Sequence, residues 1–102
     1  MSKTYTVGRG SAADIQIPKA HDAVGNVHLQ IEEAGVEKVR VTDLKSTNGT
    51  FLRVDKKWEE IKGARVVPLD AEIMLGDFTT TPRRLLADVG KPPMATQMRS
   101  WN

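Results

Sequence analysis

The sequence predicts an all-β fold, a sandwich or a barrel, and two observations support this prediction. Apolar and polar residues alternate along almost every apolar run, so that Leu29 and Ile31, for example, flank Gln30. This period of two is typical of a strand with one buried face. Residues that favour turns interrupt the runs about every eight to twelve positions, which is the strand spacing of sandwiches and barrels. A helical alternative is weak, because the longest candidate, residues 55–62, has only Trp58 and Ile61 on one face.

In chain order, the first two expected strands cover residues 4–7 and 15–17. The next two cover residues 27–33 and 38–41, and we expect them to form a hairpin that turns at Ala34-Gly35. The apolar residues that alternate inward along these strands, together with one from a later run, are the expected core: Val7, Ile15, Ile17, Leu29, Ile31, Val39, Val41 and Leu75.

The second half of the chain has a similar pattern. We expect a second hairpin from Trp58 to Val67, turning at Lys62-Gly63, and a turn at residues 70–72 before a short apolar strand at residues 73–75. Residues 55–60 are mostly charged and are expected to form a polar hairpin face. Trp58 within that run either packs against its own sheet or belongs to a partner surface.

Composition bounds the function without naming it. The chain has 102 residues, enough for one domain, with 15 Lys and Arg against 13 Asp and Glu, a net charge of +2. That surplus is too small to hold a nucleic acid by charge alone, and aromatic residues make up only 5%. The chain contains no Cys, which excludes disulfides and a catalytic thiol. We expect one domain at residues 1–89, a disordered C-terminal tail at residues 90–102, and a cytoplasmic location because signal-peptide and membrane-spanning patterns are missing.

Three loops hold polar residues that the strands do not require. The first, Gly8-Arg9-Gly10-Ser11, places a guanidinium between glycines, which suits a phosphate or a carboxylate. The second, Gly25-Asn26-Val27-His28, opens a strand, and the third, residues 45–50, contains the strong turn signal Asn48-Gly49. Each loop also has a purely structural interpretation: a solvated arginine, a buried hydrogen-bonded histidine, and a well-formed turn.

Together, the loops and their neighbouring strands resemble the forkhead-associated (FHA) domain. The matching pieces come in the family's order and cover about residues 4–86: Gly8-Arg9, Asp14-Ile15-Gln16-Ile17, Asn26-Val27-His28-Leu29, Asp43-Leu44-Lys45-Ser46-Thr47-Asn48-Gly49-Thr50-Phe51 and Leu75-Gly76-Asp77. The resemblance implies a β-sandwich of about eleven mostly antiparallel strands, similar to FHA and SMAD folds. It also implies a module that recognises phosphothreonine on a protein partner through the loops at one end, in signalling or regulated assembly.

The resemblance assigns a role to each matching loop residue. Arg9 corresponds to the arginine that pairs with the phosphate, Thr47 to a residue that contacts it, and Asn26 to a position that assists in some members. Asn48 corresponds to the asparagine that binds the backbone of the bound peptide. The positions that shape and brace the loops are Gly8, His28, Gly49 and Thr50.

This sequence departs from the family pattern at Gly25, where the family usually places a serine whose hydroxyl binds the phosphate. The Gly25 backbone N–H is left as the possible donor there. A hydrogen bond to a charged group contributes roughly 1.5–3 kcal/mol, so its loss could weaken binding about ten- to a hundredfold. An alternative function follows: a degenerate FHA domain that acts as a phosphate-independent protein-interaction scaffold.

Other classes of function have less support. Nucleic-acid binding by a small β-barrel rests only on the slight positive charge, and the sequence favours neither a nucleic-acid nor a membrane partner. An enzyme is not expected, because no pattern places a base beside Ser11, Ser46 or Thr47. We expect no cofactor and no metal site. The oligomeric state and the identity of the partner are left open.

Overall fold

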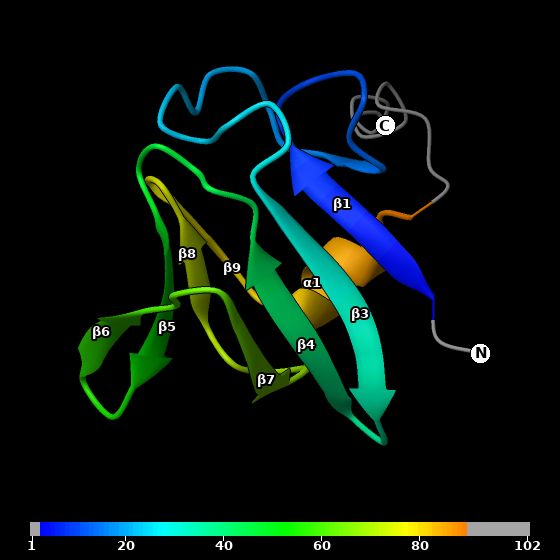
Figure 1. The fold of residues 1–102 in the computed structure, drawn as a ribbon, viewed down its shortest axis with the longest axis vertical. Helices are drawn as coiled ribbons and strands as arrows, with labels where there is room; N and C mark the ends of the chain where they lie inside the picture. Colours follow the sequence, from blue (N-terminus) through cyan, green and yellow to red (C-terminus); the bar gives the residue numbers. More distant parts are fainter. Residues whose placement is uncertain (1–2, 90–102) are drawn as a thin grey trace, which may run out of the picture.

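The computed structural model describes residues 3–89, which form two β-sheets packed face to face with one short helix (Figure 1). The expected tail, residues 90–102, lies outside the described residues. The first sheet has five strands in the order β2-β1-β3-β4-β7. Its strands are β1 (Thr4–Gly8), β2 (Ile15–Gln16), β3 (Leu29–Gly35), β4 (Lys38–Asp43) and β7 (Ala64–Pro68).

The second sheet has four strands in the order β6-β5-β8-β9. They are β5 (Thr50–Val54), β6 (Lys57–Glu60), β8 (Ile73–Leu75) and β9 (Phe78–Thr80). All pairings in the two sheets are antiparallel except that of β1 with β2, which is parallel. The predicted all-β sandwich is therefore confirmed, with two sheets that each bury one face.

Residues 3–89 form nine strands rather than about eleven. In the loops between β1 and β3, several backbone groups bond to one another. Arg9 N–H, for example, donates to the Gly25 carbonyl at 2.9 Å, and Gly10 N–H donates to the Asn26 carbonyl at 3.0 Å. These bonds satisfy the backbone without a ladder.

The core lies between the sheets and contains all eight residues expected from the alternation. Val27 is the exception to that pattern: it is 36% exposed, because the strand begins two residues later, at Leu29. The buried set adds residues that the short runs did not single out, namely Val24, Leu52, Ile61, Val67, Ile73 and Leu85. Burying each large aliphatic side chain stabilises the fold by about 1.5–3 kcal/mol.

Two expected hairpins need correction. The hairpin of β3 and β4 turns at Val36-Glu37 rather than at Ala34-Gly35, and Glu37 there has a φ of 59°. The second hairpin was wrong in its pairing: β6 pairs with β5 and β7 pairs with β4, so they lie in different sheets. The turn of the real hairpin is at residues 55–56, where Asp55 has a φ of 57°, a conformation that Asp tolerates better than most residues.

The helix α1 (Pro82–Ala87) was not expected from the sequence. It starts at the N-cap Thr81, whose side chain accepts a hydrogen bond from Arg84 N–H at 3.2 Å, and it has Pro82 in its first turn. Leu85 anchors it in the core. No helix within residues 3–89 has the length and apolar character that crossing a membrane requires.

Candidate functional site

The three polar loops meet at one end of the sandwich, where β1 ends and β3 begins (Figure 1). Residues 8–11 bond to residues 25–26 through the two backbone contacts described above. Residues 22–28 bond in turn to residues 48–49 through side chains, and the β8–β9 turn joins them, because Gly76 N–H donates to the Gly49 carbonyl at 3.1 Å. Segments that are distant in the sequence thus form one hydrogen-bonded cluster.

Arg9 directly follows β1, and its side chain crosses to the segment that precedes the second loop. Its Nε donates to the Val24 carbonyl at 2.6 Å, and one terminal nitrogen lies 4.0 Å from an Asp22 carboxylate oxygen. The side chain is 28% exposed, so its stem is largely covered. The Nε bond fixes the plane of the guanidinium, and the Val24 carbonyl leaves the donors of the terminal nitrogens unused.

His28 is fully buried and joins two of the loops. Its Nδ1 accepts a hydrogen bond from Gly25 N–H at 2.8 Å, and its Nε2 lies 2.8 Å from the Gly49 carbonyl oxygen. Because an amide only donates and a carbonyl only accepts, Nε2 carries the proton in this arrangement. The backbone N–H of His28 also donates to the Val7 carbonyl at 2.7 Å, which holds the residue at the end of β1.

The third loop is organised by Asp43 at the end of β4. One carboxylate oxygen accepts from the Ser46 hydroxyl at 2.6 Å and from the Thr50 hydroxyl at 2.7 Å, and the other accepts from Ser46 N–H at 3.1 Å. Burial raises the pKa of the Asp43 carboxyl, but the hydrogen bonds from Ser46 and Thr50 outweigh it, and the pKa is lowered overall. The Ser46 hydroxyl oxygen in turn accepts from Gly49 N–H at 3.0 Å.

Asn48 is exposed at the tip of this loop, and its side-chain amide donates to the Ala23 carbonyl at 3.0 Å. The side-chain oxygen and the second N–H of this amide stay available to a ligand. Gly76 packs against the same carbonyl so closely that a Cβ added there would lie 2.3 Å from the Ala23 oxygen. The Ala23 carbonyl is therefore held from two sides.

At Gly8 the first loop packs tightly against the second. A Cβ at this position would lie 2.1 Å from the Asn26 carbonyl oxygen, so only glycine fits without a shift of the loop. The Asn26 side chain is exposed beside it. The interaction places Arg9 and Asn26 on two segments that are packed together.

Thr47 and Gly25 differ from the other expected phosphate-binding residues. Thr47 is exposed and forms no side-chain hydrogen bond within residues 3–89, and no contact described there joins it to Arg9. The Gly25 N–H, the possible phosphate donor at this position, donates to Nδ1 of His28 in this structure. The phosphate-contacting roles of Arg9, Asn26 and Thr47, and the peptide-contacting role of Asn48, stay predictions.

Sequence reasoning missed three contributors. Asp22 and the Val24 carbonyl contact Arg9, and the Ala23 carbonyl contacts Asn48. No sequence signal marks a carbonyl, since every residue has one. Asp43 did carry a signal, because an aspartate three residues before a serine is typical of a turn in which the carboxylate accepts from the serine backbone and hydroxyl.

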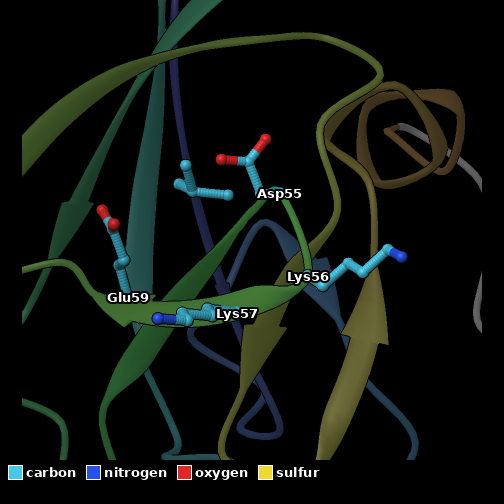
Figure 2. Close-up of a pocket in the computed structure, with 5 residues that line it drawn as sticks. Asp55, Lys56, Lys57 and Glu59 are labelled. Carbon is cyan, nitrogen blue, oxygen red and sulfur yellow. The ribbon is translucent and has the colours of Figure 1, made fainter.

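The hairpin of β5 and β6 lies away from the loop cluster and holds an open hollow of about 580 Å³ (Figure 2). It is lined by Val54, residues 55–57 and Glu59. Trp58 is 36% exposed. The Arg53 guanidinium lies over its ring, with the guanidinium carbon 5.7 Å from the ring centroid, so Trp58 packs against a neighbouring strand of its own sheet. No cluster of His, Asp or Glu that could hold a metal ion occurs among residues 3–89.

Comparisons with known proteins give the family. The model of the FHA domain matches residues 5–76. The chain is 24% identical to the FHA domain of CT664 from Chlamydia trachomatis, covering 76% of this chain and 71% of that one with a TM-score of 0.64. It is 26% identical to the FhaA FHA domain solved in complex with the intracellular domain of Rv3910, covering 74% and 75% with a TM-score of 0.58.

A further similar structure comes from a structural and functional analysis of phosphothreonine-dependent FHA domain interactions. It is 26% identical, with 76% of this chain and 73% of that chain covered and a TM-score of 0.60. The comparison with curated proteins finds no match. Because the family model spans most of the chain and the sandwich agrees with it, this chain belongs to the FHA domain family.

Proposed function

We propose that this FHA domain binds a phosphothreonine-containing segment of a protein partner at the loop cluster, in signalling or regulated assembly. The observation that carries the proposal is the Arg9 guanidinium, which is fixed through Nε to the Val24 carbonyl while its terminal nitrogens form no hydrogen bond within residues 3–89. A phosphate with about 1.5 to 2 negative charges and three acceptor oxygens fits such a fork. The relatives support it, since one belongs to a study of phosphothreonine-dependent FHA interactions.

The other residues complete the proposed site. The exposed side chains of Asn26 and Thr47 supply an amide and a hydroxyl for the phosphate, and the Asn48 amide supplies a donor and an acceptor for the peptide backbone. The buried bonds of His28 and Asp43 hold the loops that carry them. Binding groups that are fixed before the ligand arrives lose less entropy on binding.

The test is a titration of a phosphothreonine peptide library and its unphosphorylated counterpart against the wild type and Arg9→Ala. We expect the wild type to select phosphorylated peptides and Arg9→Ala to lose that selection. Thr47→Ala and Asn48→Ala should each weaken the binding. Equal binding of phosphorylated and unphosphorylated peptides by the wild type would contradict the proposal.

A phosphate-independent scaffold is the second candidate function, and Gly25 favours it. This position lacks the hydroxyl that the family usually supplies there, and its N–H donates to His28. A scaffold would capture its partner from extracts treated with phosphatase as well as from untreated ones. A partner that is lost after phosphatase treatment supports the phosphothreonine function and contradicts the scaffold.

A further inference from the structure

The charged group that faces Arg9 in this structure is a carboxylate of the chain itself. An Asp22 oxygen lies 4.0 Å from a terminal nitrogen of Arg9, on the part of the guanidinium that the Val24 carbonyl does not use. The Asp22 side chain is 94% exposed and forms no other contact to a charged group within residues 3–89. The carboxylate therefore shares the free end of the guanidinium with solvent.

The backbone on both sides of Asp22 is fixed, so this proximity is built into the loop. Asp22 N–H donates to the Ala20 carbonyl at 3.0 Å, and Val24 N–H donates to the His21 carbonyl at 3.0 Å. The residue in between, Ala23, is held through its carbonyl by the Asn48 amide. The carboxylate can rotate about its own side-chain bonds, but its attachment point stays beside Arg9.

A carboxylate at this place opposes a phosphate in two ways. It offsets part of the Arg9 charge that attracts the phosphate, and it repels the phosphate directly. We infer that Asp22 is an internal counter-charge of Arg9 which weakens phosphothreonine binding and makes it readily reversible. The inference rests on the proposed function and adds a residue that sets the affinity of that site.

The effect has a limited size because the pair is exposed. Two solvent-exposed charges interact weakly because water has a high dielectric constant, and salt screens the interaction further. We expect Asp22→Asn, which keeps the side-chain shape, to bind a phosphothreonine peptide about two- to tenfold more tightly at low salt. The gain should shrink as the ionic strength rises toward 1 M.

The experiment is a calorimetric titration of one phosphothreonine peptide against the wild type, Asp22→Asn and Asp55→Asn. Asp55→Asn is the matched control, because it makes the same change in net charge at the β5–β6 turn, away from the loop cluster, where φ is 57° and Asn is well tolerated. Tighter binding by Asp22→Asn alone supports the inference. If the wild type binds and Asp22→Asn gains nothing, the inference is overturned and the proposed function stands.

Absence of binding by all three proteins overturns the proposed function instead, so the two failures are distinguishable. A second readout needs no ligand: the NMR signal of the Arg9 Nε–H group should shift in Asp22→Asn and stay in place in Asp55→Asn. An Arg9 signal and a peptide affinity that are both unchanged in Asp22→Asn overturn the inference.

Discussion

Gly25 N–H donates to Nδ1 of the fully buried His28 at 2.8 Å. The opposite ring nitrogen bonds to the Gly49 carbonyl at the same distance, so one imidazole spans the second and third loops. This relationship explains why the family's histidine suits a position with no exposed surface. It also gives the Gly25 amide a partner within the domain.

The first prediction concerns that imidazole. His28→Ala leaves a cavity and removes the hydrogen-bond partner of the Gly25 amide and of the Gly49 carbonyl. We expect it to lower the free energy of unfolding by about 2–5 kcal/mol. Urea unfolding measures the change. The control is His21→Ala, at a ring that is 35% exposed, where we expect a much smaller loss. Equal losses in the two variants would contradict a bracing role for His28.

The second prediction is that Gly25→Ser strengthens phosphothreonine binding. A Cβ at Gly25 would lie 3.6 Å from Nδ1 of His28, an ordinary contact, so a side chain fits there. The added hydroxyl can donate to the phosphate, and a charged hydrogen bond of this kind corresponds to about a tenfold or greater gain in affinity. Gly25→Ala adds the Cβ without the hydroxyl. Our account of this position fails if serine binds no better than alanine.

The third prediction concerns Gly8, where the loops touch. Gly8→Ala places a Cβ 2.1 Å from the Asn26 carbonyl oxygen and must push the two segments apart. We expect a loss of about 1–3 kcal/mol in the free energy of unfolding, together with weaker phosphopeptide binding. Gly25→Ala is again the matched control, because its Cβ makes only ordinary van der Waals contacts, the shortest 3.6 Å to Nδ1 of His28. A Gly8→Ala variant as stable as Gly25→Ala would contradict the close approach.

The fourth prediction is a pH dependence that arises from Asp43. Its pKa is lowered from 3.8 in the folded chain, so its ionised form stabilises the fold above that pH, and the stabilisation is lost as the pH falls through the lowered value. Asp43→Asn should therefore cost about 1–3 kcal/mol near pH 7 and clearly less near pH 2–3. Urea unfolding at both pH values, with Asp55→Asn as the control, measures this. A cost that is equal at both pH values would contradict it.

The fold class and the core could be predicted because both follow from short-range alternation. Val7, Leu29 and Val41 are buried as a period of two requires. The partner strands of β6 and β7 could not be predicted, because they depend on which sheet edge each of the two strands joins. The two-residue turn at Asp55 has no strong turn signal in the sequence. The ion pair between Arg65 of β7 and Glu59 of β6, which joins the two sheets, has no sequence signal either.

The polar residues of the loop cluster could be singled out from the sequence, but the contacts that they form could not. Arg9, His28 and Asn48 stand out in the sequence because strands do not require them. Their partners are mostly carbonyl groups, such as those of Val24 and Ala23, which only the fold brings within reach. The use of the Gly25 amide by His28 likewise depends on three-dimensional geometry.

The central claim is that Arg9 reads a phosphate. The most direct test measures the dissociation constants of one phosphothreonine peptide and its unphosphorylated twin for the wild type, Arg9→Ala and the control Arg65→Ala, which removes an arginine from β7. We predict that phosphorylation tightens binding to the wild type and to Arg65→Ala and that Arg9→Ala shows no difference between the peptides. A preference for the phosphorylated peptide that survives in Arg9→Ala would contradict the claim.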